Sequence, residues 1–556
     1  MNTAYINIAL GVSLILLGLF VASDSLIWLL QGTKAIGNPQ LVLGAQLFKG
    51  GLVTIGAYTL LLRFLSTYYP SADPSSGFAE ATQSETAIFI ALLLCAIVLR
   101  FYSLDTGIWF DEMLTHVNYM PLSVGQIVST YHDANNHVLF SVLARLSLSL
   151  FGDTVWALRL PAVLFGIGSI VALYALARRV ASIRESLFAI ALMTFSFHHI
   201  WFSQNARGYT ALLFFTLLSS AWLLDAIRQG SPRKWLLYSL AVGLGAFTHL
   251  TMGLVALAHF AIWGATLFRS TPNRWNGLFY GFIPVGLLTF QAYALVLPSV
   301  VGGALLNSGL QGPDTEWTNP FWALMEIVNA VQVGFAGGAV ALVALVIFGI
   351  GLLDFLRTRP AMAALFLIPV VVGFAAMTSI GYTLFPRFFF FGMGFGIIIL
   401  IRGAVLSGQY LGRLLYLPGL WPVRMGMLFC VGIVSVSCLS LRYVYLPKQD
   451  YSGAIELIER EQKKGDRIVT IGIAGFPFNA YYGMGWENVD TLEDLSRLAP
   501  VTGRIWLIYT MPVHAKTAYP GLLALIEQDY SVVKRFWGSL NGGTVVVCLE
   551  NTRPAS

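Results

Sequence analysis

The sequence predicts an α-helical membrane protein with about thirteen spans, followed by a small α/β domain. Of its 556 residues, 57% are hydrophobic and only 11% are charged, whereas soluble domains have about 25% charged residues. The mean hydropathy is +0.73, and apolar runs long enough to cross a bilayer recur along the chain. The last segment differs, because residues 448–556 hold 11 Lys or Arg and 12 Asp or Glu.

The apolar runs define the predicted spans. The first run has no basic segment before it, so we expect a retained helix rather than a cleaved signal. We divide the chain into two N-terminal spans (1–64), a main membrane region (65–447) and a C-terminal domain (448–556). The predicted spans are 5–23, 41–63, 86–104, 155–177, 186–201, 209–227, 235–250, 252–268, 276–297, 327–356, 361–379, 386–402 and 425–442.

Basic residues predict the orientation of the spans. Every second loop is basic, and basic loops normally face the cytoplasm. Loop 65–85 departs from this pattern because it has no Lys or Arg, while the loop before it carries Lys34. In a plasma (inner) membrane, the C-terminal domain and these segments should then face outward: 105–153, 202–208, 298–322 and 380–387. The basic loops contain Arg178, Arg179 and Arg184; Arg228, Arg233 and Lys234; Arg269 and Arg274; Arg357 and Arg359; Arg402, Arg413 and Arg424.

The outer segment 105–153 has helical patterning of its own. The stretches "PLSVGQIVSTYH" and "HVLFSVLARLSLSLF" alternate apolar and polar residues at helical spacing. They predict short amphipathic helices at the membrane surface. The alternative is an amphipathic hairpin packed on the bundle.

The C-terminal domain alternates between helix and strand patterns, which predicts a layered α/β domain. It has no glycine-rich strand–turn–helix fingerprint for phosphates. The expected elements are helix 451–465, strand 466–473, helix 491–498, strand 504–510, helix 519–528 and strand 542–550.

Charge and cysteines exclude some classes of function. The net charge of +6 does not indicate nucleic-acid binding, because the basic excess lies in short loops between apolar runs. The four cysteines show neither a metal-ligand spacing nor a disulfide framework.

Asp111 and Glu112, in "GIWFDEMLTH", are the first candidates for chemistry. Two adjacent carboxylates at the end of a membrane span repel each other, and such a group can act as a general base on a hydroxyl. The alternative is structural, with a solvated acid or with Asp111 as the N-cap of a helix. Together with nearby histidines, the two acids could also hold a divalent cation, although no complete metal site is indicated.

Three further segments carry polar residues where the chain should face outward. The stretch "HDANNHVLF" holds a polar cluster that could bind a polar head group or a metal, or form an asparagine-rich turn. Its members are His132, Asp133, Asn135, Asn136 and His137. Arg207, in "SQNARGYT", could pair with a phosphate, and Tyr209 follows it closely. Arg387, in "FPRFFFF", suits an anionic lipid head group, although arginine and aromatic residues also serve as interfacial anchors.

The predicted topology puts all four segments on one face. A carboxylate and two separate arginines match the needs of transfer from a lipid phosphate. The base would activate an acceptor hydroxyl, and the cations would neutralise the departing phosphate.

At these residues the chain resembles a known family. "WFDE", "HDANNHVLFSVLARLSLSLFGDTVWALRLPAVLFGIGSIVALYALARR", "SQNARGYT" and "PRFFFF" are similar to motifs of the polyprenyl-phosphate-sugar-dependent glycosyltransferases. This family includes protein O-mannosyltransferases and the aminoarabinose transferase of lipid A, and it has the GT-C fold. The resemblance covers about residues 86–440. Two predicted spans, in residues 1–64, precede the helix that leads into the first outer loop, whereas relatives usually have one span there.

The resemblance implies roles for the candidate residues. Asp111 matches the essential acid of the first large outer loop, and Glu112 completes an Asp-Glu pair. Asn136 and His137 occupy the position where relatives carry a His or Lys before two prolines, which are absent here. Arg207 matches an Arg after the short outer turn, and Arg387 matches the Arg of an Arg-Tyr pair, here Arg-Phe, near the donor phosphate.

The resemblance also implies the reaction. The family transfers a sugar from an undecaprenyl- or dolichyl-phosphate carrier, usually with inversion and in many members without a metal. We therefore expect a polyprenyl-phosphate sugar donor, membrane lipids around it, and a glycan, lipid or protein acceptor. One alternative is a lipid-linked sugar flippase or transporter, although internal repeats and charges in the middle of spans are lacking. Another is an oligosaccharyltransferase-like enzyme, although the C-terminal domain lacks its "WWDYG"-type signature.

Overall fold

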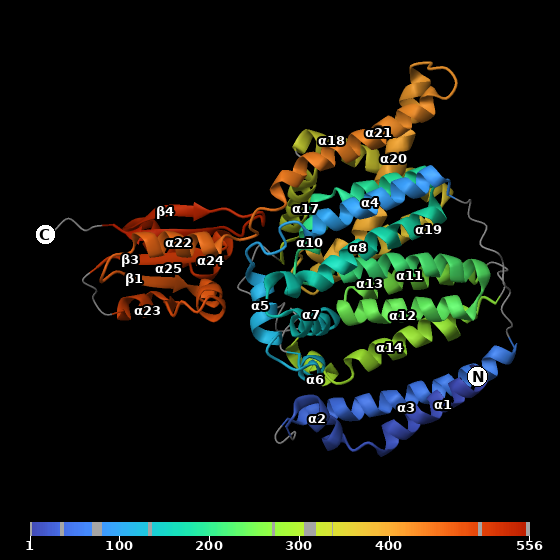
Figure 1. Ribbon diagram of the computed structural model, residues 1–556, viewed down its shortest axis with the longest axis horizontal. Coiled ribbons are helices and arrows are strands. Elements are labelled where there is room, and N and C mark those ends of the chain that lie inside the picture. Colours follow the sequence, from blue (N-terminus) through green and yellow to red (C-terminus); the bar gives the residue numbers. More distant parts are fainter. Residues whose placement is uncertain are drawn as a thin grey trace.

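The computed structural model describes residues 3–33, 38–68, 81–131, 136–268, 273–304, 318–335, 337–498 and 503–551. Long helices lie side by side in a bundle, and a smaller C-terminal domain lies against one end of it (Figure 1). We call this end the loop end, because three short helices lie there. They are α5 (Phe110–Tyr119), α6 (Val124–Ser129) and α7 (Val138–Phe151).

The bundle helices follow the predicted apolar runs. Among the described residues, eight helices are long and apolar enough to cross a membrane, or up to ten if each of two bent pairs is one span. The chain is a multi-pass membrane protein, and the number of thirteen spans stays a prediction. The bundle contains α4 (Gln83–Phe101), α8 (Val155–Val180), α9 (Ile183–Thr194), α10 (Phe197–Ser203), α11 (Tyr209–Gln229), α12 (Pro232–Thr248), α13 (Met252–Thr266), η1 (Gly277–Phe282), α14 (Ile283–Tyr293), α15 (Leu297–Ser299), η2 (Val300–Ala304), α17 (Pro320–Gly334), α18 (Gly338–Thr358), α19 (Pro360–Ser379), η4 (Pro386–Gly392), α20 (Met393–Leu414), α21 (Trp421–Leu439) and η5 (Ser440–Tyr443).

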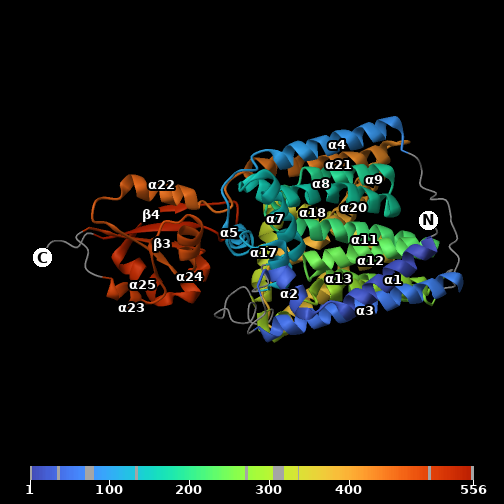
Figure 2. The same ribbon diagram turned by 60° about the horizontal axis from the view of Figure 1, so that its bottom comes forward.

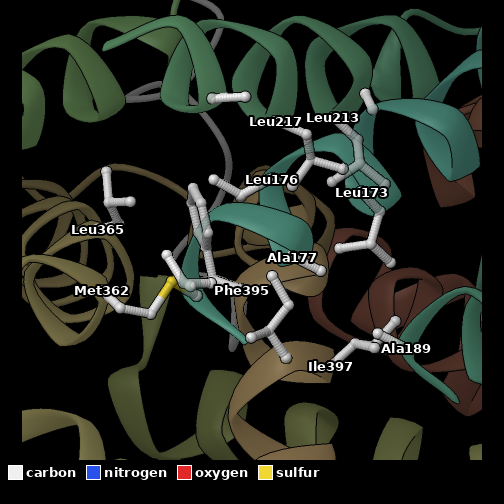
Figure 3. Packing of buried hydrophobic residues seen from close by; sticks show 14 of the residues in the cluster. Leu173, Leu176, Ala177, Ala189, Leu213, Leu217, Met362, Leu365, Phe395 and Ile397 are labelled. Carbon is white, nitrogen blue, oxygen red and sulfur yellow. The ribbon is translucent and has the colours of Figure 1, made fainter. Parts of the chain in front are cut away.

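Aliphatic and aromatic side chains fill the centre of the bundle. Figure 3 shows side chains from α8, α11 and α20 meeting there, among them Leu173, Leu217 and Phe395, which are all fully buried. Helices α18 and α20 approach at backbone distance, because a Cβ atom on Gly351 would lie only 2.0 Å from the carbonyl oxygen of Ile399. Small residues allow such close approach where lipid offers no hydrophobic driving force.

The N-terminal helices form a separate layer along the bundle. Helices α1 (Thr3–Phe20) and α3 (Pro39–Tyr68) pack as a pair, and both figures show them beside the bundle (Figures 1 and 2). Between them, α2 (Ser23–Gln31) bends away by 96° and contacts α6, where the Gln31 amide donates to Ser129 Oγ at 2.6 Å. The N-terminal layer therefore supports the loop end as well as the side of the bundle.

The C-terminal domain is a five-stranded sheet with helices. The strand order is β2-β1-β3-β5-β4. Strand β1 pairs in parallel with β2 and β3, whereas β5 pairs antiparallel with β3 and β4. The elements are α22 (Tyr451–Glu461), β1 (Arg467–Ile471), η6 (Gly472–Ala474), η7 (Phe476–Tyr481), β2 (Glu487–Val489), α23 (Leu492–Arg497), β3 (Ile505–Thr510), α24 (Pro512–Ala518), α25 (Pro520–Asp529), β4 (Tyr530–Phe536) and β5 (Val545–Glu550).

The predicted fold class is confirmed, with differences in detail. Helices α5, α6 and α7 occupy the segment predicted to hold amphipathic helices. The predicted span 327–356 is wrong as one helix, because the chain breaks after α17 and Gly337 adopts a φ of 148°, which favours glycine. The span 186–201 is bent by 60° between α9 and α10. Two strands escaped prediction: β2 has only three residues, and β4 is an exposed edge strand that buries only Phe536.

Asp466 connects the start of β1 with the start of β3 in the C-terminal sheet. Its carboxylate accepts hydrogen bonds from Arg504 Nη2 at 2.8 Å and from Trp506 Nε1 at 2.9 Å. Burial alone would raise the pKa of Asp466, but these hydrogen bonds outweigh it and hold the pKa well below its usual value. The charged form of Asp466 therefore stabilises the fold.

We predict that Asp466→Asn destabilises the C-terminal domain by about 2 kcal/mol, since hydrogen bonds to a charged group contribute about 1.5–3 kcal/mol. Because folding lowers the pKa of Asp466, its contribution is complete above the unfolded value of about 4 and is lost as the pH falls through the native value. Thermal unfolding in detergent at pH 7 measures the loss. Glu459→Gln, exposed on α22, is the control, and equal unfolding temperatures for both variants would contradict the prediction.

Candidate active site

Helix α5 carries the two acids of the "WFDE" motif. It begins at Phe110, and Glu112 reaches back to accept a hydrogen bond from the Trp109 backbone N–H at 3.4 Å. Asp111 therefore lies inside the first turn, and the alternative in which Asp111 caps the helix is wrong. The N-cap position belongs to Trp109, and the capping carboxylate is that of Glu112.

Glu112 is fully buried in a bidentate ion pair with Arg159. Arg159 Nε donates to Oε1 at 2.8 Å and Nη2 donates to Oε2 at 2.7 Å. The Ala206 backbone N–H donates to Oε1 at 2.6 Å. Burial would raise the pKa of Glu112, but the charge of Arg159 outweighs it and keeps the pKa below its usual value. These donors hold the Glu112 carboxylate in place, and the predicted catalytic role of Glu112 stays a prediction.

Arg159, from α8, was not singled out by the sequence analysis. Besides Glu112, it donates to the carbonyl oxygens of Leu104 and Thr106, both at 2.8 Å, and of Gly107 at 3.1 Å. The signal was present, because a charge inside an apolar span requires a partner. Its partner is the segment that leads into α5.

Asp111 makes a different contact, with Arg387 at the start of η4. Asp111 Oδ2 lies 3.4 Å from Arg387 Nη1, and Asp111 is 7% exposed. The Arg387 guanidinium also lies over the Phe385 ring, with its carbon 4.1 Å from the ring centre. Arg387 Nε and Asp111 Oδ2 are buried without a hydrogen-bond partner among the described residues. Both groups therefore retain capacity to bind a substrate.

His137 and Arg207 meet beside this pair. The Gly208 backbone N–H donates to His137 Nδ1 at 2.8 Å, and Arg207 Nη2 lies 3.1 Å from His137 Nε2. Burial and the nearby charge of Arg207 hold the pKa of His137 well below its usual value. Arg207 Nη1 also lies 3.4 Å from Thr115 Oγ1 of α5. A neutral His137 therefore fixes the turn that carries Arg207.

Tyr209 and His249 complete the cluster. The Tyr209 ring packs edge-on against the His137 ring, with ring centroids 4.9 Å apart. The ring centroids of His249 and His137 lie 4.7 Å apart. The Tyr209 hydroxyl is buried and interacts with the Arg387 guanidinium. His249 was missed by the sequence analysis, although a polar residue between two apolar spans on the predicted outer side was a usable signal.

Asn136 has a local structural contact. Its Oδ1 accepts a hydrogen bond from Ser141 Oγ at 2.9 Å, and its Nδ2 donates to the Thr130 carbonyl oxygen at 3.4 Å. These bonds close the segment before α7. The remaining polar residues of the predicted cluster, His132, Asp133 and Asn135, lie outside the described residues.

The structure thus brings residues from distant segments together at the loop end. His137 and His249 each experience the charges of both Arg207 and Arg387, and Arg387 contacts Asp111. An acid, two arginines and a tyrosine hydroxyl lie in one cluster. The functional roles of the predicted site residues stay predictions: Asp111, Glu112, Asn136, His137, Arg207, Tyr209 and Arg387.

No group of three or more His, Cys, Asp or Glu side chains that could hold a metal lies within the described ranges. The divalent cation considered from the sequence stays untested.

Comparison with known proteins finds a family model that matches part of the chain. Residues 136–299 match the sequence model of the dolichyl-phosphate-mannose-protein mannosyltransferases. This segment contains His137, Arg207, Tyr209 and His249, but neither Asp111 nor Arg387. The predicted resemblance to GT-C glycosyltransferases that use polyprenyl-phosphate sugars is confirmed. No curated protein is similar enough to the chain to match it.

Solved structures share the fold at low sequence identity. The oligosaccharyltransferase AglB from Archaeoglobus fulgidus, in complex with an inhibitory peptide and a dolichol-phosphate, is 12% identical with a TM-score of 0.50, covering 84% of this chain and 74% of AglB. ArnT from Cupriavidus metallidurans, bound to undecaprenyl phosphate, is 14% identical with a TM-score of 0.47, covering 86% of this chain and 100% of ArnT. The match to AglB shows that the chain has the GT-C fold.

The ion pair predicts different outcomes for the two neighbouring acids. We expect Glu112→Gln to destabilise the protein by about 3–5 kcal/mol, because it leaves the buried Arg159 charge without a full partner. Asp111→Asn should leave stability nearly unchanged, because the 3.4 Å contact of Asp111 with Arg387 is longer than the hydrogen bonds that Glu112 accepts. Thermal unfolding of both variants in detergent measures the difference, and equal unfolding temperatures would rule out the structural role of Glu112.

Proposed function

We propose that this membrane glycosyltransferase moves one sugar from a polyprenyl phosphate to an acceptor hydroxyl at the loop end. The observation that carries the proposal is the contact between Asp111 and Arg387. In this contact, Asp111 Oδ2 can still accept a hydrogen bond from a substrate, and Arg387 Nε can still donate one. A base and a phosphate-binding group are the two parts that such a transfer requires.

In the proposed reaction, Asp111 is the general base. Its carboxylate takes the proton of the acceptor hydroxyl while the acceptor oxygen attacks the anomeric carbon of the sugar. The bond from that carbon to the phosphate oxygen breaks, and its electron pair leaves with the lipid phosphate. A single displacement of this kind inverts the anomeric carbon.

Arg387 and Arg207 are the proposed phosphate ligands. Guanidinium groups bind phosphate oxygens with paired N–H donors, and they are strongest where water is excluded. Arg207 is 3% exposed, and the Arg387 guanidinium carbon lies 4.1 Å from the centre of the Phe385 ring and 6.0 Å from that of the Trp109 ring. Aromatic side chains beside the cation also suit the first apolar units of a polyprenyl chain. The Tyr209 hydroxyl would donate a hydrogen bond to an oxygen of the same phosphate.

Two findings support a lipid-phosphate donor. The matching family is described by its dolichyl-phosphate-mannose donor, and AglB, which has the same fold, binds a dolichol-phosphate. The basic loops at the opposite end of the bundle support an outward-facing loop end in a plasma membrane. The acceptor would then be a glycan, lipid or protein outside the cytoplasm.

We predict that Asp111→Asn abolishes sugar transfer, because an amide cannot accept the acceptor proton. Folding and membrane insertion should be unchanged. Transfer from matched polyprenyl-phosphate sugars is measured with purified protein. Asp153→Asn, a largely exposed acid in the same outer segment, should retain transfer, and wild-type rates for Asp111→Asn would disprove the base assignment.

We predict that Arg387→Ala weakens donor binding by about tenfold or more, since charge-assisted hydrogen bonds contribute about 1.5–3 kcal/mol each. A direct binding assay with a polyprenyl-phosphate sugar measures the change. Arg442→Ala is the control, because Arg442 is exposed and precedes the C-terminal domain. Unchanged affinity in Arg387→Ala would remove Arg387 from the donor site.

A further inference from the structure

Lys448 and Gln449 lie where the chain leaves the membrane helices and enters the C-terminal domain, between η5 and α22. Polar side chains in such a linker normally face solvent. Here Lys448 is 5% exposed and Gln449 is 1% exposed. Burial of two adjacent long polar side chains is costly unless each has specific partners.

Gln449 connects the C-terminal sheet to the helix that carries Asp111. Its Oε1 accepts a hydrogen bond from the Phe110 backbone N–H at 3.0 Å. Its Nε2 donates to the Gly543 carbonyl oxygen at 3.2 Å and lies 3.4 Å from Thr510 Oγ1, at the end of β3. The Phe110 N–H belongs to the first turn of α5, where helix N–H groups lack partners within the helix. A side chain of the C-terminal domain therefore supplies an acceptor one residue before Asp111.

Lys448 contacts the segment that leads to Arg207. Its Nζ donates to the Gln204 carbonyl oxygen at 2.6 Å and lies 5.2 Å from the centre of the Trp201 ring. Gln204 begins the short turn that carries Arg207. Two adjacent residues thus hold the segments of the proposed base and of a proposed phosphate ligand.

The last loop of the C-terminal domain fixes the dipeptide itself. The Leu540 backbone N–H donates to the Lys448 carbonyl oxygen at 3.1 Å, and the Ser539 N–H donates to that of Pro447 at 2.8 Å. A Cβ atom on Gly538 would lie 2.0 Å from the Lys448 carbonyl oxygen, so only glycine fits there. The same loop reaches the membrane part, where Trp201 Nε1 donates to Ser539 Oγ at 2.9 Å.

We propose that Lys448 and Gln449 form a latch through which the C-terminal domain sets the position of Asp111 relative to Arg207. Both are positioning residues, because they act through Phe110 and Gln204 rather than on a substrate. The inference rests on the proposed function for its effect on catalysis. Misplacement of reacting groups by about 1 Å can cost about 100-fold in rate, so loss of the latch lowers turnover more than donor binding.

Two variants of matched size test the latch. Gln449→Met removes the acceptor for Phe110, and Lys448→Met removes the donor to Gln204, while both keep an unbranched side chain of similar length. We expect kcat to fall at least tenfold in each, with the KM for donor within about twofold of the wild-type value. Gln462→Met, exposed at the end of α22, should behave as wild type.

Hydrogen exchange measured by mass spectrometry gives a readout that does not depend on transfer. Gln449→Met should speed amide exchange in residues 108–119, and Lys448→Met should speed it in 204–210, with β1, β3 and β5 unchanged in both. Unchanged exchange in these segments, or unchanged kcat in both variants, overturns the latch. If Gln449→Met does not fold, Lys448→Met decides by the same measurements. If the wild-type protein transfers no sugar from any polyprenyl phosphate, the proposed function is wrong. Amide exchange in residues 108–119 and 204–210 then still shows whether Gln449 and Lys448 hold these segments in place.

Discussion

The geometry of the loop end depends on the buried ion pair between Glu112 and Arg159. Burying either charge alone would cost several kcal/mol, so each chain segment that supplies a partner is held in place. Arg159 binds the carbonyl oxygens before α5, and Glu112 binds the Ala206 N–H. Asp111 directly precedes Glu112 and Arg207 directly follows Ala206. One structural pair therefore fixes the acid and a cation of the proposed site through the residues next to them.

A second buried cation shapes the same region from the membrane side. At the bend between α9 and α10, Arg100 of α4 donates to the carbonyl oxygens of Met193 at 3.1 Å and Thr194 at 3.3 Å. Arg100 Nη2 also lies 2.7 Å from His199 Nδ1. The bend directs α10 toward the C-terminal domain and brings the turn with Arg207 over the end of the bundle. Arginines inside the apolar helices thus build the scaffold, while Arg387 contacts Asp111 and Arg207 contacts His137.

Sequence patterns predicted the helices, the C-terminal domain and most of the cluster for physical reasons. Hydropathy identifies spans, and arginines or acids isolated in short outer segments stand out against apolar surroundings, as Asp111, Arg207 and Arg387 do. Contacts that depend on three-dimensional approach left no such pattern. The pairing of Glu112 with Arg159 joins two helices, and the adjacent carboxylates of Asp111 and Glu112 gave no sign that Glu112 is the one fully buried in an ion pair with Arg159. Gln449 is an ordinary polar residue in a linker, and its importance follows only from the fold that buries it.

The contact between Gln449 and Phe110 also affects the order of events during biosynthesis. The two residues are separated by 339 positions in the chain, so at roughly 5–20 residues per second the ribosome needs about 20 to 70 s to make the second after the first. Throughout that time the first turn of α5 lacks an acceptor that the finished protein provides. Gln449, which is made late, thus completes the first turn of α5, which is made early. A product that stops before Gln449 has the helices of the bundle, but its α5 lacks the contact that holds Asp111 in place. Synthesis of the whole chain is in this sense the final step of assembling the site.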